Sequence, residues 1–139
     1  MGYTTKFAGY LRLSRRLTIA EARLLLLYAD DSRNAPAPNP GGYLQWVPSA
    51  SLDTIGWDGN EKFYNYVEWL RWVCAWLKDA GIAANGSIVW FSEEVCDTGT
   101  ITVIENFVRC TKNNAPPPIE FRPLTMAALA DMALKQVTA

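Results

Sequence analysis

Histidine is absent from this chain of 139 residues, and cysteine and charged residues are both scarce. Without histidine the commonest general base and the commonest metal ligand are missing, which excludes a nucleophilic triad and a histidine-bound zinc site. The three cysteines, Cys74, Cys96 and Cys110, lack CxxC spacing and are odd in number, which indicates free thiols in a reducing cytosol. We therefore expect a protein that is not an enzyme and holds no cofactor and no metal.

Long apolar segments are also missing. No run approaches the roughly 20 apolar residues that a membrane-spanning helix needs. The N-terminal sequence MGYTTKF lacks the basic and then apolar pattern of a signal peptide. These absences predict a cytoplasmic protein that has no membrane partner.

The chain is instead rich in aromatic residues and unevenly charged. Half of its residues are hydrophobic, and it has six tryptophans, six tyrosines and five phenylalanines, enough for a real core and for large contact surfaces. Residues 1–33 hold six basic side chains against three acids, whereas residues 53–105 hold nine acids against three bases. Such a split is usual for solvated faces of opposite sign, and it also suits an acidic face that meets a basic partner.

The first half of the chain reads as strand, helix and two short strands. Residues 4–13 alternate between apolar and polar side chains, which predicts a half-buried strand. Thr18 and Glu21 have the spacing of a capping box, so we expect a helix from there to about Ala29. After the proline-rich loop 33–42, strands are expected at 43–47 and 52–57.

The second half is predicted to contain a long helix followed by antiparallel strands. The helix spans about 61–81, with Asp58 or Asn60 as its N-cap and Gly81 at its C-terminal end. The dipeptide Asn85-Gly86 is a strong turn signal, and strands are expected at 87–92, 100–104 and 107–111.

This order, β-α-β-(β)-α-β-β, predicts the α+β class: a two-layer sandwich with an antiparallel-rich sheet and two helices on one face. A ferredoxin-like arrangement with an added edge strand is one candidate. We assign residues 1–114 to this domain and residues 115–139 to a Pro-rich linker and a C-terminal helix. That helix must dock on this domain or on another chain, through a stripe formed by Met126, Leu129, Ala130, Ala133 and Val137.

A row of tryptophans is the most informative feature of the long helix. Trp69, Trp72 and Trp76 lie at i, i+3 and i+7, between the stripe assigned to the sheet and the polar stripe. One interpretation is that the C-terminal helix or the first helix covers them as part of the core. The other is a protein-binding or homodimer surface, because tryptophan dominates binding hot spots. If they are exposed, we expect these three residues to anchor the partner.

Two charged clusters are weaker candidates. Glu93, Glu94 and Asp97 crowd one strand connection, where they are either a solvated, charged turn or a pair of carboxylates for a divalent cation or for acid–base chemistry. In the binding hypothesis they steer a basic partner. In the basic cluster, Arg12, Arg15 and Arg16 accompany Tyr10, so that these residues are the alternative, nucleotide-binding site. Direct nucleic-acid binding is disfavoured, because nucleic-acid-binding domains are usually far more basic than this chain.

Several motifs, in order, resemble a family of small uncharacterised phage and prophage proteins. They are MGYTTKFAGYLRLSRRLTIAE, YLQWVP, WDGNEKFYNYVEWL and NGSIVWFSEE followed by DTGTITVIENFV, and together they cover about residues 1–108. The family tends to have glycine where this chain has Ser92, and we do not associate the Pro-linked tail with it. The resemblance implies a mobile-element context and carries no catalytic residues.

The sequence therefore predicts a non-enzymatic binding protein that docks on a host protein complex. An anti-CRISPR-type inhibitor that binds a CRISPR effector subunit is the concrete version of this hypothesis, by analogy with other small phage proteins. The alternative is a nucleotide-binding or nucleotide-sequestering oligomer that uses the basic cluster.

Overall fold

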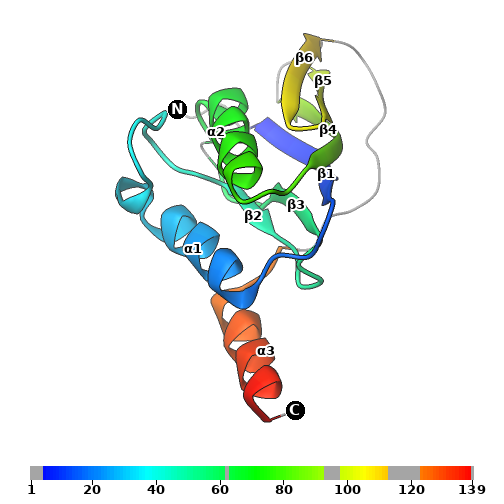
Figure 1. Ribbon diagram of the computed structural model, residues 1–139. Helices are drawn as coiled ribbons and strands as arrows, with labels where there is room; N and C mark the ends of the chain where they lie inside the picture. The colour runs from blue at the N-terminus through cyan, green and yellow to red at the C-terminus, as the bar shows by residue number, and fades with distance from the viewer. Residues whose placement is uncertain (1–4, 62, 93–97, 113–122, 139) are drawn as a thin grey trace.

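The structure is a computed structural model that describes residues 5–61, 63–92, 98–112 and 123–138. Its elements are, in chain order, β1 (Thr5–Leu13), α1 (Ile19–Asp30), η1 (Ser32–Asn34), β2 (Trp46–Pro48), β3 (Thr54–Trp57), α2 (Tyr66–Asp79), β4 (Ala84–Ser92), β5 (Thr98–Ile104), β6 (Phe107–Lys112) and α3 (Met126–Thr138). The strands form one open antiparallel sheet in the order β2-β3-β1-β4-β5-β6. In Figure 1, α1 and α2 lie on one side of it, which confirms the predicted α+β class.

The strand order agrees with the ferredoxin-like candidate, and two strands, β5 and β6, extend the sheet at one edge instead of a single added strand. Every ladder of the sheet is antiparallel, including the central β1–β4 pair. In a split β-α-β unit of the ferredoxin type, a third strand lies between the two strands that the helix connects, so all neighbouring strands are antiparallel. Here β3 lies in this way between β1 and β2, which α1 connects. In this sheet β3 and β4 flank β1, and α2 connects them across it.

The two faces of the sheet have different compositions, because successive side chains of a strand point to opposite sides. On β1, Phe7, Leu11 and Leu13 are buried, whereas Lys6 and Arg12 are exposed. The inner face, which we define by these buried residues, faces α2: the Phe7 ring lies 5.0 Å from that of Tyr66. The outer face carries the alternate residues.

The start of α1 is the one predicted from the capping box. The Thr18 hydroxyl accepts a hydrogen bond from the Glu21 amide, and the Glu21 carboxylate accepts one from the Thr18 amide. These bonds satisfy amides that have no partner within the helix. The buried residues of α1 are Ala22, Leu25, Leu26 and Tyr28.

The helix α2 begins five residues later than the sequence predicts. Its N-cap is Asn65, in a left-handed conformation (φ 58°), and neither Asp58 nor Asn60 caps it. Asp58 instead binds the backbone and side-chain amides of Asn60 within a turn. The reason is Phe63, which is buried in a ring cluster with Phe7, Trp46, Trp57 and Tyr66. Burial of this ring on the sheet takes precedence over an additional helical turn.

Two strand predictions also need correction. Residues 43–45 are not in a strand, since β2 is limited to Trp46–Pro48. Asn85-Gly86 is no turn, because both residues belong to β4 and pair with Arg12 and Leu11. A Cβ at Gly86 would lie 2.4 Å from the Tyr10 carbonyl oxygen, so glycine is required here by close strand approach.

The predicted turn at Glu105-Asn106 is confirmed, and Asn106 ties it to the core. Both residues have positive φ, 46° and 69°, as in the hairpin turns that match strand twist. The Asn106 side-chain amide donates to the carbonyls of Cys74 and Ile82, and its oxygen accepts from the Ala84 amide. One side chain thus joins the β5–β6 hairpin to α2 and to the start of β4.

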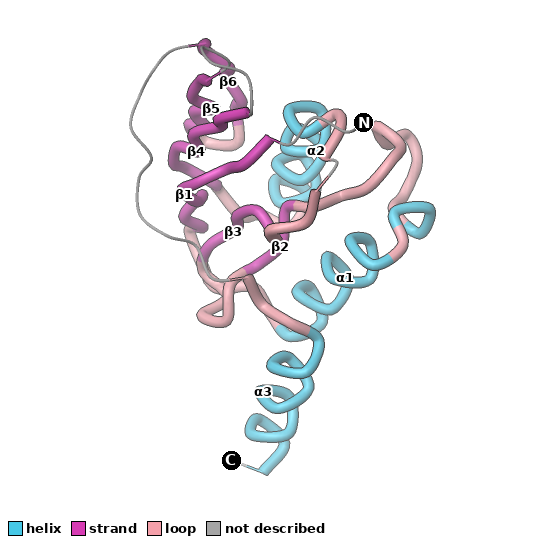
Figure 2. Tube along the Cα trace, turned by 180° about the vertical axis from the view of Figure 1, so that it is seen from behind, coloured by secondary structure: helices cyan, strands magenta, loops and turns pink. Residues whose placement is uncertain are grey.

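The C-terminal helix α3 docks on α1 and on the β2 edge. The Leu124 amide donates to the Pro48 carbonyl at 2.8 Å, and Leu124 and Leu129 are buried in the core cluster. Figure 2 shows α3 extending beyond the sheet from beside the N-terminal end of α1. The predicted stripe is partly wrong: Met126 and Ala130 are exposed, because the helix turns Leu129 and, in part, Met132 inward.

Candidate binding surfaces

The tryptophan row is covered by the loop 35–43 and by α1, rather than by α3. Trp69 is fully buried, and its indole N–H donates to the Gly41 carbonyl at 2.8 Å. Trp72 is half-buried, donates to the Pro36 carbonyl at 3.3 Å and meets the Tyr28 ring edge to face. Trp76 is half-buried against the core. The loop therefore supplies acceptors for buried indole groups as well as connecting two elements.

This placement limits what the row offers a partner. The anchoring hypothesis required exposure, and Trp69 has no accessible surface. Trp72 and Trp76 keep part of theirs, so their contact with a partner stays a prediction. The acidic candidates Glu93, Glu94 and Asp97 lie outside the described residues, and their role also stays a prediction.

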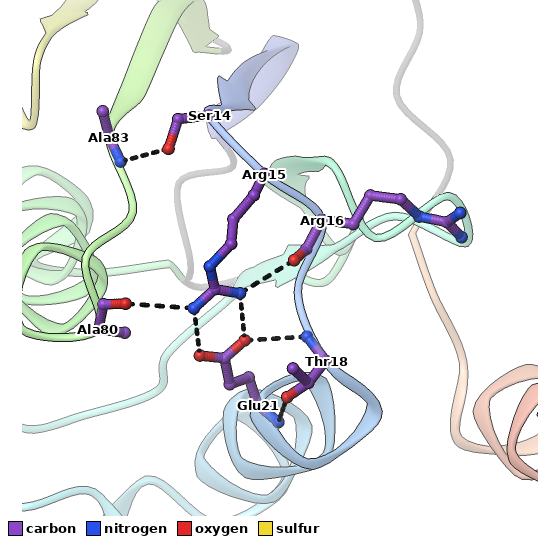
Figure 3. A network of polar contacts seen from close by, with 7 residues as sticks. All are labelled: Ser14, Arg15, Arg16, Thr18, Glu21, Ala80 and Ala83. Carbon is purple, nitrogen blue, oxygen red and sulfur yellow. Dashed lines mark hydrogen bonds and ion pairs between the residues drawn. The ribbon is translucent and has the colours of Figure 1, made fainter.

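The structure divides the basic cluster between two locations. Tyr10 and Arg12 project from the outer face of β1, where Tyr10 is half-buried and Arg12 exposed. Arg15 points to the helices instead: it forms a bidentate ion pair with Glu21, at 2.8 and 2.9 Å, and donates to the Ala80 carbonyl at 3.1 Å (Figure 3). Arg16 donates to the Ser51 carbonyl at 3.0 Å. The four residues therefore do not form one site.

The ion pair of Arg15 has a structural role. The hydrogen bonds from the Arg15 guanidinium lower the pKa of Glu21 to about 2. The hydrogen bonds with Thr18 also lower this pKa, whereas partial burial of the carboxylate raises it. Hydrogen bonds to an ionised partner are stronger than neutral ones, and this carboxylate accepts from both Arg15 and the Thr18 amide. The pair connects the N-terminus of α1 to the C-terminal end of α2, so these charges are already used within the fold.

A groove between α2 and β6 was not predicted from the sequence. It has a volume of about 240 Å³ and is lined by Arg71, Cys74, Ala75, Lys78, Asn106, Phe107 and Val108. Glu68 and Arg71 of α2 also lie beside Cys110 of β6. Burial raises the pKa of the Cys110 thiol, Arg71 lowers it and Glu68 raises it. A polar stripe of α2 thus follows the outermost strand of the sheet.

The strand β6 presents free backbone groups along this groove. Ile104 and Phe107 flank the two-residue turn and so form a hydrogen-bonded pair, after which the bonded positions alternate along the ladder. The N–H and C=O groups of Val108 and Cys110 consequently point away from β5. Within the described residues no strand pairs with this edge. The opposite edge, β2, is short and is bound by Leu124.

Both described thiols have a raised pKa, which disfavours the reactive thiolate form. Burial raises the pKa of Cys74 to about 12, in keeping with the small core residue predicted from its helical stripe. No group of three or more metal-ligating side chains occurs among the described residues. A wide depression of about 560 Å³ is lined by Asp30, Asp31, Ser32, Arg33, Gly42 and Tyr43. Its Arg33 is paired with Asp31 at 2.8 Å and is 91% exposed, so that no preformed ligand site results.

Comparisons with known proteins add no information on function to this geometry. No helix in the described part of the chain is long and apolar enough to cross a membrane. The chain matches no family model, no curated protein and no solved structure. The resemblance to phage proteins therefore remains a prediction from the sequence motifs.

Proposed function

We propose that this protein acts without catalysis, by docking on another protein through the β6 edge. The β6 edge consists of the outward backbone groups of Val108 and Cys110 together with the groove to α2. The observation that carries this proposal is that these groups end an open sheet without a paired strand in the described structure. An extended segment of a partner can add there as a seventh strand.

The groove supplies the selectivity that backbone pairing lacks. Main-chain hydrogen bonds provide affinity in strand addition, and pockets beside the edge select the side chains of the added strand. Here the selecting residues are Arg71, Ala75 and Lys78 of α2, and the apolar Phe107 and Ile104 lie at the hairpin end, 67% and 59% exposed. Two cations flank the place of the added strand, so a partner segment with acidic side chains is favoured electrostatically.

The target class comes from the sequence resemblance. A host protein complex, with a CRISPR effector subunit as the concrete case, fits a small mobile-element protein that acts stoichiometrically, in the cytoplasm of the host. Trp72 and Trp76 could add contact area from another side of α2. The nucleotide-binding alternative is weakened, since Arg15 and Arg16 both bind within the fold.

The experiment that tests this proposal compares two substitutions at one position. Cys110→Pro removes the outward N–H, which an edge strand tolerates because β5 does not need it, whereas Cys110→Val keeps the N–H. We expect capture of a CRISPR effector from lysate by tagged protein to fall about tenfold or more with proline, and to persist with valine. Circular dichroism and thermal melting check that both variants fold.

Equal capture by the folded proline variant would reject the β6 edge as the docking surface. Light scattering of the purified protein, as a function of concentration, tests the homodimer alternative. Association that Cys110→Pro abolishes would identify a second copy of the chain as the strand donor.

A further inference from the structure

Among the described strand residues, those on the outer face of the sheet are basic, aromatic, aliphatic or uncharged polar, and none is acidic. The strand residues that point to it in the described structure include Lys6, Arg12 and Arg109, and no aspartate or glutamate. The whole chain has 13 basic and 14 acidic residues, so the described strands hold cations without a matching number of acids. In Figures 1 and 2, α1 and α2 both lie on the other side of the sheet.

One end of this face forms a continuous band across four strands. The register places Tyr10 beside Ser87, Ser87 beside Thr102 and Thr102 beside Arg109. The next row runs from Arg12 and Asn85 to the cross-strand pair Ile104–Phe107. We name these eight residues the outer band. It leaves out the other end of the face, where Val89 is buried.

The dimensions of the outer band suit an extended chain with regularly spaced charges. Arg12 on β1 and Arg109 on β6 are separated by three strand spacings of roughly 4.8 Å across the sheet and by two residues, about 7 Å, along the strands, which gives about 16 Å in all. Side chains between the two arginines, such as Ser87 and Thr102, are short or half-buried, so they do not project far above the sheet. A single strand of nucleic acid crossing the sheet would bring phosphates to both guanidinium groups.

The aromatic residues of the outer band provide surfaces on which nucleic-acid bases can stack. Phe107 is 67% exposed, although an isolated aromatic ring gains nothing from facing water. Tyr10 presents part of its ring on the same face. Nucleic-acid bases stack on such rings irrespective of sequence, and single-strand-binding sheets combine them with cations. Hydroxyl and amide groups of Ser87, Thr102 and Asn85 lie between the rings as hydrogen-bonding partners.

We propose that the outer band binds single-stranded nucleic acid, with Arg12 and Arg109 on phosphates and Tyr10 and Phe107 stacked on bases. This goes beyond the proposed docking function, and the two surfaces share only Ile104 and Phe107 at the hairpin end. The rim of the band carries one opposing charge, Glu105, whose carboxylate accepts a hydrogen bond from Asn85 at 3.3 Å. Its presence, and the few cations, point to weak binding that depends strongly on salt.

The test uses the full chain with fluorescent oligo(dT) and oligo(U), read by fluorescence anisotropy at low salt. We expect a Kd on the order of 10⁻⁵ M. Replacement of both Arg12 and Arg109 by alanine should weaken binding at least tenfold. It should also lower the slope of log Kd against log salt by about 1.4, or roughly 0.7 for each phosphate that is no longer neutralised. The matched control is Arg23→Ala with Lys78→Ala, which removes two exposed cations from the helices. It should retain the wild-type affinity.

A second pair of variants tests the stacking. Tyr10→Leu with Phe107→Leu keeps apolar surface but removes both rings, and should weaken oligonucleotide binding about tenfold. Polyphosphate, a polyanion without bases, should compete poorly at equal charge. The two oligonucleotides distinguish DNA from RNA as the ligand.

Several outcomes would overturn the proposal: no anisotropy change at any protein concentration, equal loss in the helix control, or polyphosphate binding as tightly as the oligonucleotides. The same holds if the outer-band variants lose a protein partner while oligonucleotides never bind, since the face would then be a protein surface. Cys110→Pro should leave oligonucleotide binding unchanged, so failure of the docking proposal and failure of this one are distinguishable.

Discussion

The inner and outer faces of the sheet are built from alternate residues of the same strands, yet they have opposite character. On β4 the inner residues Ile88 and Trp90 are buried, and the outer residue Ser87 is exposed. The inner face is continuous with the helices: the Trp90 ring lies 6.2 Å from that of Tyr66 on α2. The outer face has neither α1 nor α2 on it.

This difference shows why whole-chain properties predict this protein's surfaces poorly. A net charge of −1 disfavours nucleic-acid binding when the chain is considered as one body. The period of two in a strand separates residues that are adjacent in sequence, so that Arg12 faces outward while its neighbour Leu11 is fully buried. Charge per face is therefore the quantity that bears on binding.

The contrast between the faces is tested most strongly at two adjacent residues of β4. Ile88→Ala removes inner-face apolar surface and leaves a cavity, so we expect the free energy of unfolding to fall by about 2–5 kcal/mol. Ser87→Ala changes only the outer face and should stay within about 0.5 kcal/mol of wild type. Urea denaturation measures both. Similar losses for the two variants would show that the outer face is packed as well.

A smaller effect is expected at the turn that ends the outer band. Asn106→Gly keeps the positive φ but leaves the Ala84 amide and the carbonyls of Cys74 and Ile82 without their partner. We expect a loss of about 2–3 kcal/mol in the free energy of unfolding.

The matched control for this turn is Glu105→Gly. Glu105 also has positive φ, but its side chain interacts only with the half-buried Asn85 among the described contacts, so the change should be nearly neutral. If both glycine variants were equally stable, the inward bonds of Asn106 would not hold the hairpin to α2.

Local sequence signals were sufficient for the elements whose causes are local. The alternation in 4–13 and the Thr18–Glu21 capping box predict β1 and the start of α1, because the responsible residues lie within one element. The α+β class follows from the order of such elements. The β5–β6 hairpin also belongs to this group, since Glu105 and Asn106 adopt the backbone conformation that a two-residue turn requires.

Features that depend on contacts between distant residues could not be predicted in this way. The helical periodicity of the sequence includes Phe63. Only the packing of Phe63 against the rings of Phe7 and Trp46 shows that this residue lies outside the helix. The glycine of Asn85-Gly86 signals special backbone geometry correctly, and its cause is the approach of β1. Likewise, nothing in the prolines and glycines of the loop 35–43 shows that their carbonyls accept from Trp69 and Trp72.

The smallest predicted effect concerns the polar link on the helix side of the sheet. The folded pKa of Glu21, about 2, lies below the ordinary value of 4.5 because of Arg15, so the ionised carboxylate favours the folded state. This stabilisation is complete above pH 4.5 and is lost as the pH falls toward 2. Because Arg15 is 42% exposed, solvent screening reduces the contribution to about 1 kcal/mol.

Glu21→Gln isolates this charge, since glutamine can still complete the capping box. We expect the variant to be less stable than wild type by about 1 kcal/mol at neutral pH, and the difference to vanish as the pH approaches 2. Denaturation curves at a series of pH values measure this convergence. Asp31→Asn is the control, since its partner Arg33 is almost fully exposed and its removal should alter the pH dependence much less. A constant gap between Glu21→Gln and wild type across this range would mean that shape, and not charge, joins α1 to α2.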